Sequence, residues 1–485
     1  MQISPLIRRM TRHKWFCPAV LLGLAALLGV YHISRTVVIS EDGVLYIKMA
    51  QTLPGGYAEI CRKFPPGFPM LLYLARKLAF LSADFSVNLS WIHSSQTAVL
   101  LTQLGALFFL WKIGCRLFRP VWTFAGLLIL LVLPISKHGC DVLRDWPHLL
   151  FLSAAFYALL RNLEKQSLLG WMVSAFLGGV GYLFRPECAQ ILLYLAVVLS
   201  ILFWKQRTAA NAGRLLTAAV LIAAAWLLPV LPYWLYADSI LPAKLPAMVR
   251  SITPDFFSPS NTLPPKTSFP TALFDFLQDL TENFLYILLP FWLIGLLHFF
   301  RIKYLAKNLS RIMLTVFLAV NVFLLLSLYI GWGYICRRHI LPFIALSCPL
   351  IPLGIWLLSY YLHCQSSLFL KVQTRRIFVG CLMIAVLTAA PKLAKPLHYD
   401  KKVYLQAAEW ISEHIEPSAR IFADDKRVPF YAERQIASSE KDADYRILIT
   451  SRKSATNSPS ADSILQTWSN GKIMIQFCKT AGSIK

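Results

Sequence analysis

Long apolar segments, separated by short basic loops, dominate this sequence. About eleven of them approach the roughly 20 residues that a helix needs to cross a bilayer. Hydrophobic residues make up 57% of the chain and charged residues 15%, whereas soluble domains carry about 25% charged residues. We therefore predict an all-α polytopic membrane protein and exclude a soluble globule or a disordered chain. The predicted spans are 15–39, 91–111, 121–136, 147–160, 168–184, 189–204, 215–236, 284–300, 312–330, 340–362 and 377–390.

The charge pattern gives these spans a direction. Lys and Arg total 48 against 24 Asp and Glu, a net charge of +24, which in a soluble protein would point to nucleic acid. Here the basic residues cluster in alternate loops, for example 8–14, 112–119 and 371–376, so these loops and the N-terminus are expected in the cytoplasm. We expect contact with membrane lipids and no nucleic-acid partner. An odd number of spans places the C-terminal tail outside, and we favour a bacterial inner membrane.

Two outward segments are too polar to span a membrane. The first is the outer loop 40–90, inside a membrane domain predicted to cover 1–391. The second is the tail 392–485, predicted to be a small extracytoplasmic α/β domain. Within the tail, apolar residues recur at helical spacing over 403–415, and β-like runs follow. These runs lie at 420–422, 445–450 and 472–477.

Three smaller features complete the predicted organisation. The loop 251–270 is rich in Pro and Ser and is expected to be irregular. The charged run 424–427 in the tail is expected to be solvated. The 10 Cys are scattered, and we interpret them as small apolar residues rather than a disulfide framework.

The first outer loop carries the strongest candidate for catalysis. Ser40 is a suitable N-cap for a helix over 41–53, and Asp42 and Tyr46 share one face of that helix. The acids Glu41 and Asp42 would then lie at the membrane surface, although they also suit a helix N-terminus for electrostatic reasons alone. The helix is expected to rest on the bilayer through a stripe made of Leu45, Met49 and Leu53.

Other outward corners also hold charged residues, which are costly near a membrane and therefore mark candidate functional sites. In the second outer loop Asp141 and Asp145 are four residues apart, as are Arg144 and His148, and local salt bridges are the alternative explanation. Two Arg near 337 break the positive-inside rule, which indicates an anion site or contact with lipid headgroups. The candidate substrate-binding residues are Tyr46, Lys63, Asp141, Arg144, Asp145, Arg185, Glu187, Arg337 and Arg338.

Four short motifs in these corners resemble one known group. They are EDGVLYIKMA at 41–50, FPPGFP at 64–69, LFRPE at 183–187 and RHILP at 338–342. In this order the chain resembles the membrane-embedded GT-C glycosyltransferases, the group that holds the dolichyl-phosphate-mannose–protein mannosyltransferases and the bacterial aminoarabinose transferases. The resemblance covers roughly residues 10–435.

The resemblance implies a GT-C type bundle and a specific reaction. The donor would be a sugar on a polyprenyl phosphate at the outer leaflet, and the acceptor a hydroxyl group of a glycan, lipid or protein. Asp42 would contact the acceptor and act as base in an inverting transfer, with Glu41 as the second candidate catalytic residue. Two departures concern the site: the second loop carries Asp141 and Asp145 where the group more often has Glu, and His339 replaces the usual Tyr.

The same residues bear on cofactors and on alternative functions. No cofactor is required for this reaction and no metal ligands are predicted, although clustered acids would also suit a divalent metal. A transporter or flippase of lipid-linked glycans is the main alternative, and a scaffold acting through the tail is the third. Transporters more often show internal repeats and polar residues at mid-membrane depth. Neither feature is evident here, which favours the transferase.

Overall fold

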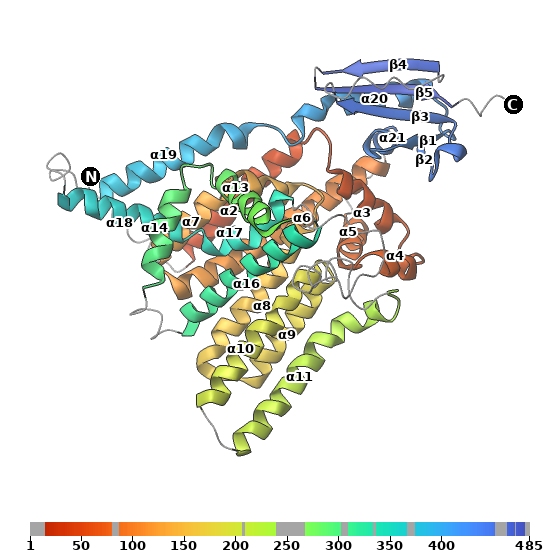
Figure 1. Cartoon of the computed structure of the whole chain (residues 1–485). Coiled ribbons are helices and arrows are strands. Elements are labelled where there is room, and N and C mark those ends of the chain that lie inside the picture. Colours follow the sequence, from red (N-terminus) through yellow and green to blue (C-terminus); the bar gives the residue numbers. More distant parts are fainter. Residues whose placement is uncertain are drawn as a thin grey trace.

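The computed structural model of the protein describes residues 15–79, 87–205, 209–238, 267–301, 309–332, 336–365, 374–451, 463–470 and 472–480. Helices form one large bundle, and a five-stranded sheet lies at one end of it (Figure 1). The helices that follow the first span lie at the same end as the sheet, whereas residues 145–234 extend toward the opposite end.

Each predicted span contains a helix. Six of the described helices are long and apolar enough to cross a membrane, or up to eight if each of two bent pairs is one span. Two shorter apolar helices, α9 and α14, account for two further predicted spans. The chain is thus an integral membrane protein, as predicted. Its bundle contains α2 (Phe16–Arg35), α6 (Val87–Leu117), α7 (Pro120–Val132), η1 (Pro134–Cys140), α8 (Asp145–Lys165), α9 (Leu168–Tyr182), η2 (Pro186–Ala189), α10 (Gln190–Lys205), α11 (Ala209–Trp234), α14 (Leu289–Phe299), α16 (Leu309–Trp332), η4 (Arg337–Ile340), α17 (Leu341–Ser347), α18 (Leu350–Gln365) and α19 (Thr374–Ala394).

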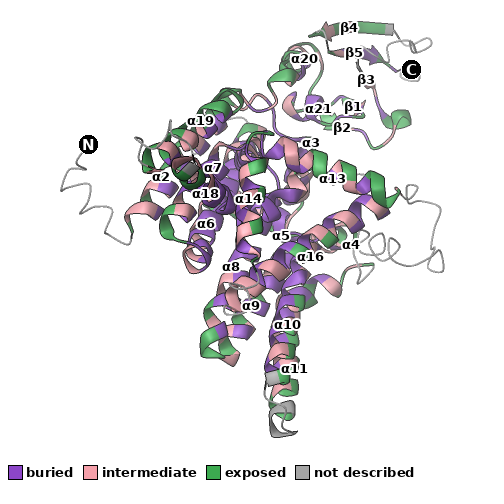
Figure 2. Ribbon diagram, turned by 60° about the vertical axis from the view of Figure 1, so that its left-hand side comes forward, coloured by how far each residue is buried: buried purple, intermediate pink, exposed green. Residues whose placement is uncertain are grey.

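The core lies in the middle of this bundle. Figure 2 shows buried residues concentrated around α6, α14 and α18, and all seven residues of α17 are buried. On the outside, large apolar side chains such as Leu27, Leu101 and Leu297 are mostly exposed, as lipid-facing positions should be. All ten cysteines are free, which confirms that they form no disulfide framework.

The first outer loop folds into three short helices, α3 (Glu41–Gln51), α4 (Tyr57–Lys63) and α5 (Gly67–Leu78). Ser40 caps α3 as predicted, because its hydroxyl accepts a hydrogen bond from the Gly43 amide at 3.2 Å. The helix ends at Gln51, two residues before the predicted end. The predicted bilayer stripe is not the buried face.

The buried face of α3 consists of Val44, Tyr46, Ile47 and Ala50 together with Gly43. Leu45, Met49 and Leu53 are only half-buried. This helix packs against α5 and α6, which accounts for its buried face. That the half-buried stripe rests on the bilayer stays a prediction. A helical pattern read from sequence cannot distinguish these two apolar surroundings.

The tail folds as an α/β unit at residues 399–480. Strand order is β2-β1-β3-β5-β4, parallel at β2-β1-β3 and antiparallel at β3-β5-β4. The predicted helix and three predicted β-like runs are confirmed, whereas β2 and β4 were not expected. The elements are η5 (Tyr399–Lys401), α20 (Lys402–His414), β1 (Arg420–Ala423), α21 (Arg427–Tyr431), β2 (Gln435–Ile436), η6 (Glu440–Asp442), β3 (Tyr445–Ser451), β4 (Ser463–Ser469) and β5 (Ile473–Lys479).

The prediction that run 424–427 is solvated holds for Asp424 and Lys426, which are exposed, and was wrong for Asp425 and Arg427, which are buried. Arg427 is buried and makes a bidentate pair with Asp425, with Nε to Oδ1 at 2.8 Å. The Arg427 guanidinium also lies 4.8 Å from the ring centre of Tyr404 on α20. Charge density alone did not reveal this packing, because a paired Arg can be buried without an unsatisfied charge.

A helix after the Pro- and Ser-rich loop was not anticipated, nor were the short helices α4, α5 and α21. α13 (Phe269–Asn283) follows the Pro- and Ser-rich loop and begins at an N-cap, Ser268, whose side chain accepts from Thr271 N. Most of the predicted irregular loop 251–270 lies outside the described residues. Residues 269 and 270, however, belong to this helix.

Candidate active site

Close packing joins the first and second outer loops. A Cβ added at Gly43 would lie 2.9 Å from Cβ and from O of Val142, so a side chain there would push α3 off the second loop. The amide of Ser40 donates to Asp141 Oδ1 at 3.0 Å. The first acidic motif therefore lies directly against the second loop.

Similar packing joins the second and third motifs. The Gly67 amide donates to Leu183 O at 2.9 Å, and a Cβ at Gly67 would lie 2.7 Å from that oxygen. Tyr46 on α3 packs edge-on against Phe68, with ring centres 4.9 Å apart. The Arg144 guanidinium lies 5.8 Å from the Tyr46 ring centre. Three motifs are thus in contact.

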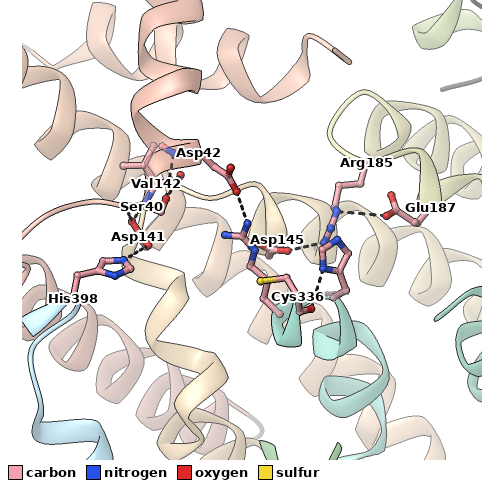
Figure 3. A network of polar contacts seen from close by, with 12 residues as sticks. Ser40, Asp42, Asp141, Val142, Asp145, Arg185, Glu187, Cys336 and His398 are labelled. Carbon is pink, nitrogen blue, oxygen red and sulfur yellow. Dashed lines mark hydrogen bonds and ion pairs between the residues drawn. The ribbon is translucent and has the colours of Figure 1, made fainter. Parts of the chain in front are cut away.

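A chain of alternating charges links all four corners (Figure 3). Arg338 Nη2 donates to Asp42 Oδ2, and Arg338 Nε lies 3.8 Å from Asp145 Oδ2. The other oxygen of Asp145 accepts from Arg185 Nη1 at 2.6 Å. Arg185 Nε lies 3.8 Å from Glu187 Oε1. These contacts join five residues into one cluster, which we call the charged chain: Asp42, Arg338, Asp145, Arg185 and Glu187.

Exposure varies along the charged chain. The side chains of Asp145 and Arg185 are 3% and 4% exposed, whereas Asp42 is 49% exposed. Burial alone would raise the pKa of Asp145, but Arg185 and then Arg338 lower it to about 2. The interior of the charged chain is thus a fixed ion pair of Asp145 and Arg185, and Asp42 is the accessible end of the charged chain.

The pKa of Asp145 predicts an acid-resistant pair. The folded-state pKa of about 2 lies below the usual Asp value of 3.8, so the pair stabilises the fold above about pH 4 and loses this contribution as the pH falls through the folded pKa. We expect the difference in Tm between wild type and Asp145→Asn in detergent to stay constant from about pH 7 to about pH 5. A difference that shrinks markedly over this interval would contradict the assignment.

Asp141 has a different place from Asp145. It is fully buried, and its Oδ1 accepts from the amides of Ser40 and Val142, at 3.0 and 2.8 Å. Its Oδ2 lies 3.0 Å from His398 Nε2. Burial would raise the pKa of Asp141, but its hydrogen bond to His398 and these amides lower it. Asp141 therefore supports the loop, and only Asp145 belongs to the charged chain.

Besides Asp141, Tyr46 and Arg144, three further predicted site residues do not join the charged chain. Lys63 pairs with Glu59 at 3.1 Å, and both side chains are mostly exposed. Glu41 is exposed at the start of α3, where partial burial and then Asp425 of the tail raise its pKa. The Arg337 side chain contacts acids outside the charged chain, unlike that of Arg338.

Arg337 is held by two acids that the sequence did not reveal. Its Nε lies 3.2 Å from Asp279 Oδ1, and its Nη1 lies 2.5 Å from Glu282 Oε2. Both acids lie on α13, three residues apart and so on one face of the helix. The spacing of Asp279 and Glu282 was a signal in the sequence, but it could not identify Arg337, more than 50 residues away, as their partner.

A cavity of about 440 Å³ lies beside the charged chain. Arg337, Arg338, Lys392 and His138 supply its basic lining, and Glu282 its acidic lining. Lys392 was not among the predicted residues. Because Arg338 also contacts Asp42, the cavity adjoins the accessible carboxylate of the first loop.

The described residues show no group of three His, Cys, Asp or Glu side chains that could hold a metal ion. The carboxylates of the charged chain face guanidinium groups instead. That the reaction needs no cofactor stays a prediction.

Comparisons with known proteins agree with this geometry. Residues 86–234 match the sequence family described as Dolichyl-phosphate-mannose-protein mannosyltransferase. No curated protein sequence matches the chain.

Solved structures extend the likeness to the whole fold. ArnT from Cupriavidus metallidurans, solved bound to undecaprenyl phosphate, aligns with a TM-score of 0.58 at 13% identity, over 95% of this chain and 97% of that one. The oligosaccharyltransferase of Archaeoglobus fulgidus aligns with a TM-score of 0.54 at 11% identity, over 89% of this chain and 65% of that one. The same enzyme, AglB, in complex with an inhibitory peptide and a dolichol-phosphate, aligns at 0.53 and 12% identity, with the same coverage.

These likenesses confirm the resemblance that the four motifs predicted. The alignment with ArnT covers 95% of this chain, and the family match covers the second to sixth predicted spans and nearly all of the seventh. The chain therefore has the fold of the GT-C membrane glycosyltransferases.

Proposed function

We propose that the protein is a membrane glycosyltransferase that moves a sugar from a polyprenyl-phosphate donor to an acceptor hydroxyl outside the cytoplasm. The observation that carries the proposal is the basic cavity beside Asp42, lined by Arg337, Arg338 and Lys392. Similar proteins have been solved with undecaprenyl phosphate and with a dolichol-phosphate, which supports a lipid-phosphate donor.

The phosphate of the donor would bind these cations. Guanidinium and ammonium groups make charge-assisted hydrogen bonds to phosphate oxygens, which are about twice as strong as neutral ones. Phosphate is a good leaving group and needs no general acid, so the cations would stabilise the charge that develops as the sugar departs. Donor binding would compete with Asp42 for Arg338 and leave the carboxylate free.

Asp42 would then serve as base. It lies in the first turn of α3 and is half exposed at the end of the charged chain. A carboxylate within reach of an acceptor hydroxyl can remove its proton as the oxygen attacks the sugar. Attack opposite the leaving phosphate inverts the anomeric centre. Tyr46 and Arg144 would line the same site from the first and second loops.

A transfer assay tests the proposal. Membranes with and without the protein would be incubated with radiolabelled polyprenyl-phosphate sugars and an envelope extract as acceptor. We expect label to leave the lipid and join a glycan, lipid or protein only when the protein is present. Label that crosses the bilayer while still on its lipid would indicate the transporter alternative.

Lys392→Ala tests the role of the cavity. Loss of one charge-assisted hydrogen bond, worth about 1.5–3 kcal/mol, is expected to raise KM for the donor by about 10- to 100-fold, with a smaller effect on kcat. The matched control is Lys395→Ala, since the Lys395 side chain lies by Tyr399 and not among the residues lining the cavity. Equal effects of the two variants would contradict the assignment of phosphate to this cavity.

A further inference from the structure

Two residues of the C-terminal segment, Tyr431 and His398, help to fix two successive backbone amides just before α3. Tyr431 does so directly and His398 through Asp141. The Ile39 amide donates to the Tyr431 hydroxyl at 2.9 Å. The next amide, that of Ser40, donates to Asp141, whose other oxygen lies 3.0 Å from His398 Nε2. Tyr431 and His398 are separated from these amides by more than 350 residues in sequence, and Asp42 follows only two residues later.

The segment that carries His398 is itself anchored to the membrane domain. The Lys137 ammonium donates to Lys392 O at 2.7 Å, the Tyr31 hydroxyl to Ala394 O at 3.1 Å, and the Val37 amide to Leu397 O at 3.2 Å. These contacts fix the chain up to the residue before His398. The ring of His398 is therefore presented to Asp141 from a held segment.

The backbone of His398 is also unusual. Its φ is +52°, in the left-handed region that non-glycine residues adopt only rarely. Such a conformation is strained and persists only where the surroundings impose it. Here the conformation accompanies the contact between the ring and the buried Asp141.

We propose that His398 and Tyr431 are positioning residues for Asp42, which hold the start of α3 through Asp141 and through the Ile39 amide. The inference rests on the proposed function for the role of Asp42 as base. The tail is then a part of the active-site framework. A base must be held within about 0.5 Å of its productive place, so two lost hydrogen bonds at the helix start matter.

Hydrogen exchange of the full-length protein in detergent tests the clamp without any activity. In His398→Ala we expect exchange in peptides covering 39–42 and 141–143 to become about tenfold faster, while peptides from α11 stay unchanged. Tyr431→Phe should act on the 39–42 peptide alone. The control is His414→Ala, whose ring contacts the backbone of Trp410 within the tail. Unchanged exchange at 39–42 in both test variants would overturn the proposal.

If His398→Ala loosens the entire tail, Tyr431→Phe tests the proposal instead. This change removes only the hydroxyl that accepts from the Ile39 amide and keeps the packed ring. Steady-state kinetics of the His398 variants give a second, independent test of the proposal. We expect His398→Ala to lower kcat by about tenfold or more with KM for the donor within about twofold, and His398→Gln to restore most of kcat by offering an N–H at similar reach. No rescue by Gln, or a change in KM alone, would contradict a positioning role. An inactive wild type would count against the proposed function, while the exchange result would still judge the clamp.

Discussion

Replacing Asp42 by asparagine is expected to lower the rate of sugar transfer by about 10²- to 10⁴-fold, the usual contribution of a positioned base. Asparagine matches aspartate in size, and half of the Asp42 side chain is exposed. The variant should therefore insert and fold, and the loss should appear in kcat with little change in KM for the donor. Single-turnover transfer of labelled sugar by the purified protein is the measurement.

Two neighbouring acids serve as comparisons for this variant. Glu41→Gln should have a smaller effect, because Glu41 lies by Asp425 and Arg427 of the tail rather than by Arg338. Glu59→Gln, on the exposed pair with Lys63 in the same loop, should leave transfer within about twofold. Transfer by Asp42→Asn at the rate of Glu59→Gln would remove Asp42 from the mechanism.

Arg185→Leu is expected to be the most destabilising single change in the site. Both Arg185 and Asp145 are almost fully buried and lie 2.6 Å apart. Removing one partner of a buried pair leaves the other charge uncompensated, at a cost of about 3–5 kcal/mol. Denaturation in mild detergent, followed by tryptophan fluorescence, should show this loss as a large fall in Tm.

A second variant separates charge from packing. The double change Arg185→Leu with Asp145→Leu should recover part of the stability, because the buried Asp145 charge is then removed as well, although Glu187 still loses its contact with Arg185. It should not recover transfer. Lys63→Ala breaks an exposed pair with a similar distance of 3.1 Å, and exposed pairs are worth about 0.2–1 kcal/mol. A loss in Arg185→Leu no larger than in Lys63→Ala would show that the buried pair contributes little.

Much of this architecture follows from local patterns. Apolar runs of membrane-spanning length predicted the helices, and Ser40 predicted the start of α3 through its capping side chain. Three of the four motifs supply members of the charged chain, namely Asp42, Arg185 with Glu187, and Arg338, and the second outer loop supplies Asp145. Residues that act within one turn or one loop leave such local signals.

Contacts between distant segments left no signal in a single sequence. His398 meets Asp141 across 257 positions, and Arg337 meets α13 acids through tertiary packing alone. The choice between Asp141 and Asp145 likewise needed three dimensions, since both are buried acids of one loop. The face of α3 that packs against protein could not be predicted for the same reason: its apolar residues lie on more than one side of the helix, and only its neighbours decide which side is covered.

The side of the membrane on which Asp42 lies is the claim on which the proposed reaction depends most. Two exposed native cysteines can report on which side each part of the chain lies. Cys336 precedes Arg337, and Cys364 lies near the C-terminal end of α18, shortly before the basic segment 371–376 in sequence. Intact cells and permeabilised cells would be treated with a membrane-impermeant maleimide, with Cys336→Ser and Cys364→Ser variants to assign the label. We expect Cys336 to react in intact cells and Cys364 only after permeabilisation. Reaction of Cys364 in intact cells, with Cys336 protected, would place the site in the cytoplasm and contradict the proposal.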